Sequence, residues 1–206
     1  MEWIHRTRSD DDPIAEFWQW FESVAGTLAR DFENPEVIEA LNRRVGELGE
    51  MAWELGPGIK EENMLVLSPD GDVSRLHETR ALIGLAPSLP GWEFHPARPA
   101  RPSPLKFSID TDSNRKLEVD AERWSYVLLR FKDGSTEVIV EQPESAEWSE
   151  DDCWAAAIVA LDGLLGEERR LAGIDTLDVV AEMPDEYKTK RKPLAYLSGQ
   201  LSSLGR

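Results

Sequence analysis

Apolar residues recur at helical spacing in the first quarter of the chain, in two stretches. The acidic residues before Pro13 predict the first helix start, because negative charge suits the positive end of a helix dipole and proline suits the first helical position. Asn34-Pro35 predicts the second start in the same way. The apolar stripes are Ile14, Phe17, Trp18, Phe21, Ala25, Leu28 and Phe32, and then Ile38, Leu41, Val45, Leu48 and Ala52. We expect an antiparallel helical hairpin over residues 1–58.

The middle of the chain carries short apolar runs that are typical of strands. We expect these strands at residues 64–67, 92–94, 105–109, 116–119, 124–132, 135–142 and 174–181. Asp133-Gly134 lies between two strong candidates and favours a two-residue hairpin turn with positive φ at both positions. A helix is expected over residues 73–86. Residues 96–104 hold four prolines and should be extended or looped.

A long apolar stretch follows a helix-capping signal at Ser149 and Asp152. Residues 154–165 are apolar on nearly all sides, so we expect a central helix that buries Trp154. The charged run at residues 167–170 is interpreted as a solvated turn. A basic cluster at residues 188–192 precedes a narrow stripe of leucines at helical spacing, and we expect this tail to be dispensable for folding. The stripe is Leu194, Leu197, Leu201 and Leu204.

After the helical hairpin, the strands at residues 64–67, 92–94, 124–132, 135–142 and 174–181 and the two helices between them give the order β-α-β-β-β-α-β. Omitting one edge strand leaves the β-α-β-β-α-β pattern of ferredoxin-like folds. The fold class is therefore α+β, with an N-terminal helical hairpin followed by a ferredoxin-like antiparallel or mixed sheet and two helices on one face. We assign the sheet to residues 59–185, and a basic linker with a C-terminal amphipathic helix to residues 186–206.

The charge of the chain limits its partners. With 206 residues and a formal net charge of −17, the protein repels nucleic acid and anionic membranes, and favours a basic protein partner or none. No apolar run approaches the roughly 20 residues that cross a bilayer. The start of the chain is polar and acidic, and Cys153 is the only cysteine, so no internal disulfide can form. We expect a soluble cytoplasmic protein of undetermined oligomeric state.

Residues with catalytic or metal-binding patterns are scarce. The three histidines have no His or Cys at metal-ligand spacing, and the chain has neither a glycine-rich phosphate loop nor a nucleophile elbow. We expect no metal, no cofactor and no catalytic residues. The carboxylates are so abundant that pairs of them indicate nothing specific.

Residues 92–101 hold the most unusual mixture of side chains. Strand alternation places Trp92 and Phe94 on one face, with Glu93 and His95 on the other. The candidate ligand-binding residues could bind an anionic ligand, or the arginines could simply offset an acidic surface. The candidates are Glu93, His95, Arg98 and Arg101.

Two further tryptophans, Trp20 and Trp53, flank the expected helical hairpin. They form a candidate interaction surface. The alternative is that both rings pack into the core, which is the usual role of a tryptophan inside a domain.

Four sequence blocks carry a resemblance. Residues 17–21 (FWQWF), 67–71 (LSPDG), 89–94 (LPGWEF) and 161–167 (LDGLLGE) resemble blocks of uncharacterised bacterial proteins of unknown function, over about residues 14–182. The resemblance implies a bacterial origin and no known catalytic residues. Proteins of this size and acidity also occur as immunity partners of secreted bacterial toxins.

Two hypotheses follow from the sequence. The first is a non-enzymatic acidic protein-interaction module, of inhibitor or immunity type. The alternative is an enzyme or small anionic-ligand binder that uses residues 92–101.

Overall fold

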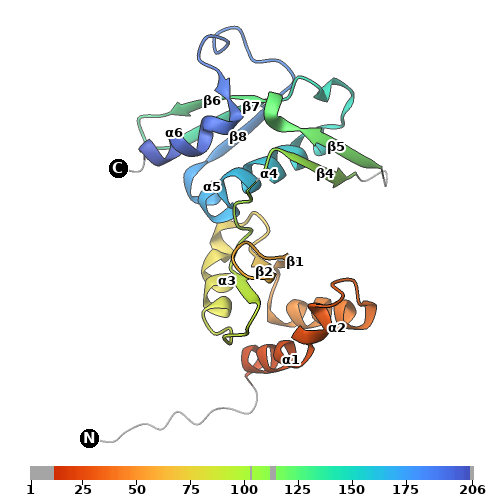
Figure 1. Cartoon of the computed structure of the whole chain (residues 1–206). Coiled ribbons are helices and arrows are strands. Elements are labelled where there is room, and N and C mark those ends of the chain that lie inside the picture. Colours follow the sequence, from red (N-terminus) through yellow and green to blue (C-terminus); the bar gives the residue numbers. More distant parts are fainter. Residues whose placement is uncertain (1–11, 103, 112–114, 205–206) are drawn as a thin grey trace, which may run out of the picture. The chain divides into compact units, whose positions relative to one another are not determined.

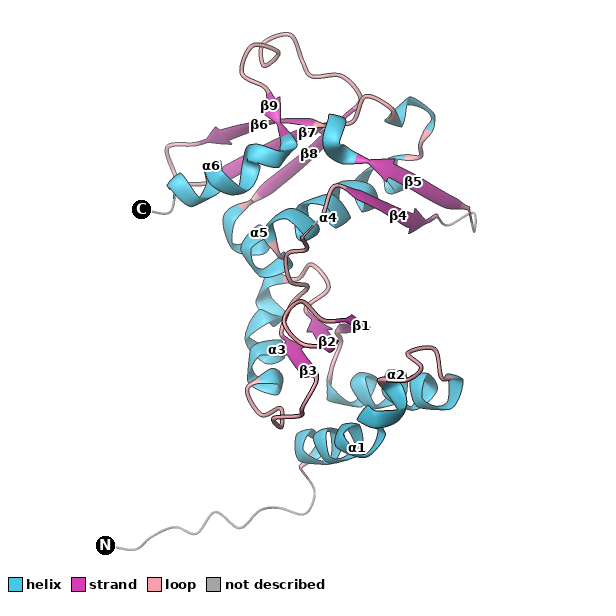
Figure 2. Cartoon of the chain, in the orientation of Figure 1, coloured by secondary structure: helices cyan, strands magenta, loops and turns pink. Residues whose placement is uncertain are grey.

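The computed structural model describes residues 12–102, 104–111 and 115–204 and shows an α+β protein (Figure 1). The chain divides into two compact units, unit 1 (Met1–Ala97) and unit 2 (Arg98–Arg206). The helices and strands of both units are distinguished in Figure 2. Among the described residues, no helix is both long and apolar enough to cross a membrane.

Unit 1 combines helices with a three-stranded sheet. The helices are α1 (Pro13–Leu28), α2 (Pro35–Leu48) and α3 (Leu76–Ile83), with a 3₁₀ turn at Val73–Arg75, and the strands are β1 (Ala52–Pro57), β2 (Asn63–Ser68) and β3 (Trp92–His95). The sheet order is β1-β2-β3, in which β1 and β2 are antiparallel and β2 and β3 parallel. The central strand β2 is buried along its whole length, which explains its continuous apolar sequence.

The two predicted helix starts in unit 1 are confirmed by side-chain caps. The carboxylate of Asp12 accepts a hydrogen bond from Ile14 N–H (3.1 Å), and Asn34 Oδ1 accepts one from Val37 N–H (3.2 Å). Both helices place their apolar stripes in one core with β2. These local signals work because a cap satisfies backbone N–H groups that have no partner within the helix.

Unit 2 contains a hairpin, a four-stranded sheet and three helices. The hairpin is β4 (Lys106–Asp110) with β5 (Lys116–Asp120); the sheet strands are β6 (Ser125–Arg130), β7 (Thr136–Glu141), β8 (Thr176–Val180) and β9 (Lys192–Pro193); the helices are α4 (Glu150–Leu165), α5 (Glu167–Gly173) and α6 (Leu197–Leu204). Short 3₁₀ turns lie at Ala121–Arg123, Ser145–Glu147 and Leu194–Tyr196. The sheet order is β8-β7-β6-β9, with only β7 and β8 parallel.

One hydrophobic core holds unit 2 together. It includes Val119 of β5, Tyr126 of β6, Val138 of β7 and Leu161 of α4, all at most 4% exposed. In Figure 2, α4 runs alongside the four-stranded sheet. The core therefore joins the β4–β5 hairpin, the larger sheet and α4 into one body.

The single ferredoxin-like sheet expected from the sequence is not confirmed. The described strands form three separate sheets rather than one. Sequence patterns locate strands one at a time, whereas strand pairing depends on contacts between residues that are distant in sequence. The expected strands are nevertheless observed near their predicted positions.

The two units also differ from the sequence-based division at residues 58 and 185. Residues 52–57, interpreted as the end of the second helix and a turn, form β1 and pair with β2 across residue 58. Beyond residue 185, Leu194 and Leu197 lie in the core of unit 2. The boundary observed at residue 97 lies instead in the proline-rich stretch.

The turn between β6 and β7 is not the two-residue turn that was predicted. Phe131 N–H bonds to Ser135 O (2.9 Å) and Gly134 N–H bonds to Phe131 O (3.1 Å), which makes a three-residue loop. Within this loop only Gly134 has positive φ (93°), as expected for a three-residue loop whose last residue adopts the left-handed backbone conformation. The hairpin is right, but its loop is one residue longer.

Substitution of Gly134 should therefore destabilise unit 2. Gly134→Ala is expected to lower the free energy of unfolding by about 1 kcal/mol, because a Cβ disfavours left-handed backbone. Gly199→Ala, at an exposed helical position with open space around the new methyl, should be neutral or stabilising. Chemical denaturation of both variants checks this. Equal effects of the two substitutions would show that the turn tolerates a side chain.

The tail is part of the core, contrary to the expectation that it can be removed. Leu194 and Leu197 are at most 1% exposed, and β9 pairs with β6. The side chain of Leu204 lies outside the described part of the structure. Deletion of residues 187–206 would thus remove core side chains and an edge strand together.

Leu197→Ala is expected to lower the free energy of unfolding by about 2–5 kcal/mol, since it leaves a cavity in a packed core. Its neighbour Tyr196 is 66% exposed, so Tyr196→Ala should change stability by less than about 0.5 kcal/mol. Urea titration of the two variants measures the difference. A Leu197→Ala protein as stable as the Tyr196→Ala protein would mean that the tail is not packed as described.

Candidate functional site

Glu93 and His95 lie on β3 of unit 1. Trp92 and Phe94 face the aromatic core from the opposite side of the strand, as strand alternation predicts. The Glu93 carboxylate accepts hydrogen bonds from the backbone N–H groups of Ile59 (2.5 Å) and Lys60 (3.1 Å), and lies 3.3 Å from His95 Nε2. Burial raises the pKa of Glu93, but these bonds outweigh it and the net pKa is lowered. Glu93 thus fixes the position of the loop between β1 and β2.

Arg98 and Arg101 belong to unit 2. Arg98 Nη1 lies 3.3 Å from Oε1 of Glu167, a carboxylate with no exposed surface, and the two backbones also bond through Glu167 N–H to Arg98 O (2.8 Å). Arg101 N–H donates to Gly163 O (2.8 Å). The four candidate residues are therefore divided between the two units, and Arg98 ties the start of unit 2 to α5.

A second buried ionic contact lies at the corner between α4 and α5. Arg170 Nε lies 2.5 Å from Asp162 Oδ1, and both side chains are largely buried. Burial raises the pKa of Asp162, and the bond to Arg170 only partly offsets this. The run at residues 167–170 is thus a buried helix start rather than the solvated turn that was predicted.

Two glycines let Ala100 and Pro104 lie directly against this corner. A Cβ at Gly163 would stand 2.9 Å from Pro104 Cβ, closer than atoms pack. Gly166 has a φ of 81° and would bring a Cβ within 3.3 Å of Ala100 N. These close contacts explain why the chain has glycine at positions 163 and 166. They also give the segment that carries Arg98 and Arg101 a structural role.

Trp20 and Trp53, the candidate interaction surface, are both half-buried and both contact α2. The guanidinium carbon of Arg44 lies 5.0 Å from the Trp20 ring, and Trp53 Nε1 donates to Asn42 Oδ1 (3.3 Å). Both rings also pack against the core of unit 1. They are only partly available to a partner.

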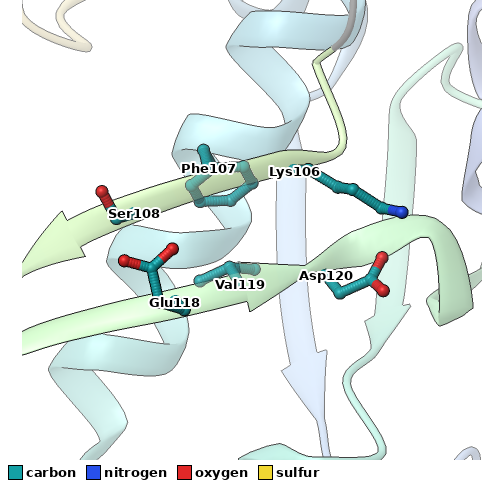
Figure 3. A pocket seen from close by; sticks show the side chains of 6 residues that line it. All are labelled: Lys106, Phe107, Ser108, Glu118, Val119 and Asp120. Atoms are coloured by element: carbon teal, nitrogen blue, oxygen red, sulfur yellow. The ribbon is translucent and has the colours of Figure 1, made fainter.

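A shallow groove of about 420 Å³ lies on the β4–β5 hairpin (Figure 3). Lys106 stands opposite Asp120, and Ser108 stands opposite Glu118, across the two strands. The Lys106 ammonium bonds to Glu122 (2.8 Å). Among the described residues, no three His, Cys, Asp or Glu side chains are grouped to hold a metal ion.

A second groove of about 440 Å³ lies where β6, β7 and β9 meet, and Glu141 is one of the residues that line it. The Glu141 carboxylate accepts hydrogen bonds from the Ser125 hydroxyl, from Met183 N–H (2.8 Å) and from Arg191 Nη1 (3.2 Å). Burial raises the pKa of Glu141, but these partners outweigh it and the net pKa is lowered. Glu141 thereby clasps the basic tail to the sheet.

The face of α4 that points away from the core is the most unusual surface. Trp154 is 39% exposed and Val159 is 41% exposed, with Ala155 exposed and Ile158 half-buried beside them. The expectation that Trp154 is buried is therefore wrong. An all-apolar sequence shows that a helix can be buried on every side, but not how many sides its neighbours cover.

Carboxylates surround the first turn of this helix. Glu147, Glu150 and Asp151 are exposed, and the sequence from Asp133 to Glu168 contains no lysine or arginine. Each of the buried carboxylates in this stretch, by contrast, is paired with an arginine. These are Glu141 with Arg191, Asp162 with Arg170, and Glu167 with Arg98.

Comparison of the chain with models of known protein families, with curated proteins and with solved structures finds no match. The functional argument therefore rests on the residues and their geometry.

The clasp at Glu141 predicts a pH-dependent contribution to stability. Because the folded-state pKa is below the ordinary 4.5, the ionised carboxylate stabilises the protein above that pH, and the contribution is lost as the pH falls through the folded-state pKa. Glu141→Gln should thus be destabilising at pH 7, with a difference from wild type that shrinks under acid. Denaturation from pH 3 to pH 7 measures it.

Glu118→Gln, at an exposed position on β5, serves as the control and should cost little at pH 7. A Glu141→Gln penalty that is constant across the pH range would contradict the clasp.

Proposed function

We propose that this protein acts by binding a basic protein partner, as a non-enzymatic acidic interaction module of inhibitor or immunity type. The observation that carries the proposal is the surface of unit 2, where exposed apolar side chains adjoin exposed carboxylates in a stretch without lysine or arginine. Interfaces with charged partners combine these two features.

The distribution of charge supports the same function. The three buried carboxylates between residues 133 and 168 have arginine partners, whereas Glu147, Glu150 and Asp151 are exposed on a chain with a net charge of −17. Such a surface attracts basic proteins over a Debye length and accelerates their association. It also repels nucleic acid, whose binding needs cationic side chains.

The alternative function, an enzyme or small anionic-ligand binder built on residues 92–101, has weaker support. Glu93 is occupied by backbone N–H groups, and Arg98 is occupied by Glu167. Neither has its charge available for a ligand. As the compartment we propose the bacterial cytoplasm, because the free thiol of Cys153 suits a reducing environment.

The proposal predicts salt-sensitive binding of a basic protein. The purified protein, immobilised, should retain one from a bacterial lysate, and the purified pair should dissociate as salt rises from about 0.1 M to about 1 M, since the Debye length shortens from about 10 Å to about 3 Å. Neutralising Glu147, Glu150 and Asp151 as amides should weaken the complex.

The matched control removes the same charge from exposed carboxylates of unit 1, namely Glu22, Glu36 and Glu39. This control variant should bind the basic protein more tightly than the variant neutralised at Glu147, Glu150 and Asp151. Failure to retain a protein at low salt, or a complex indifferent to salt, would overturn the proposed function.

A further inference from the structure

The exposed face of α4 has the geometry of a helix-docking surface. Trp154, Ala155, Ile158 and Val159 occupy positions i, i+1, i+4 and i+5, so they lie on one side of two consecutive turns. Asp151 lies one turn earlier on the same side. The opposite side of α4 holds Ala156, Ala157, Ala160 and Leu161, which have no exposed surface.

This apolar face has definite ends. Toward the C-terminus it stops at Gly163, which Pro104 covers so closely that a Cβ there would stand 2.9 Å from Pro104 Cβ. Toward the N-terminus it stops at the exposed carboxylates. The accessible length, residues 151–159, is about 13 Å at 1.5 Å per residue, which matches two to three turns of another helix.

Covering exposed apolar groups of a helix with a partner lowers the free energy of the complex. Such groups mark interaction sites when they adjoin one another. The charge at the N-terminal end decides which partner fits. Glu147, Glu150 and Asp151 attract a cationic segment, and no basic side chain of the sequence from residue 133 to 168 opposes them. A second copy would double these carboxylates at the interface, and like charges disfavour such contacts.

We propose that this face of α4 binds an amphipathic helix of a partner protein, whose apolar stripe covers Trp154 and Val159 and whose Lys or Arg side chains face Glu147, Glu150 and Asp151. This mode is the packing of an amphipathic helix onto an apolar strip. The inference rests on the proposed function and names the site and the kind of segment that it binds.

The test uses two synthetic peptides of about 18 residues with the same lysine and leucine composition. One places its leucines on a single helical face, and the other has them scrambled. Fluorescence anisotropy of labelled peptide gives the dissociation constants at about 0.1 M salt. The amphipathic peptide should bind at least about tenfold more tightly than the scrambled one.

The double variant Trp154→Ser/Val159→Ser should weaken binding of the amphipathic peptide at least about tenfold, because a central buried aromatic dominates such interfaces. Phe131→Ser is the matched control, since Phe131 is an apolar residue of the same unit and is 48% exposed. It should leave the affinity unchanged. Thermal denaturation verifies that all variants fold.

The outcomes separate the two proposals. If both peptides bind equally and salt weakens both, charge-driven binding stands and the α4 site is refuted. If neither peptide binds at low salt, both proposals fail. If light scattering shows a wild-type dimer that the double variant converts to a monomer, a second copy occupies the face and the partner helix is refuted.

Discussion

Unit 2 depends on the close approach of its other segments to α4, and small residues make this approach possible. Ala156, Ala157 and Ala160 have no exposed surface, and Gly163 leaves room only for Pro104. Larger side chains at these positions would push away the sheet or the proline-rich segment, because protein interiors are packed without spare volume. The same core receives the tail through Leu194 and Leu197, so segments far apart in sequence meet at one helix.

The buried ion pairs act as connections rather than as reactive groups. Asp162 with Arg170, and Glu167 with Arg98, join α4, α5 and the start of unit 2 at one corner. A buried pair gains little net stability, but removing one partner leaves an uncompensated charge, so such pairs constrain how the segments meet. Their carboxylates are thereby withdrawn from the surface.

Helix α4 thus has two faces with different roles. One is covered by the core of unit 2, and the other presents Trp154 and Val159 beside exposed carboxylates. In unit 1 the aromatic residues are mostly structural. Phe21 packs edge-on against Trp92 at 5.1 Å, and Trp18 Nε1 donates to Leu82 O (3.1 Å). In unit 2, Trp124 and Tyr126 are likewise buried in the core, at 1% exposed each, so Trp154 differs from them in being 39% exposed.

The sequence by itself determined the features that depend on neighbouring residues: the caps at Asp12 and Asn34, the alternation of β3, and the need for glycine at position 134. Only the tertiary structure decided which strands pair, that Glu93 and Arg98 already have partners, and that one face of Trp154's helix stays uncovered. Caps and turns arise from contacts a few residues apart, and sequence patterns record these directly. Pairing, charge compensation and exposure depend on which distant segments pack together, and no local pattern contains that information.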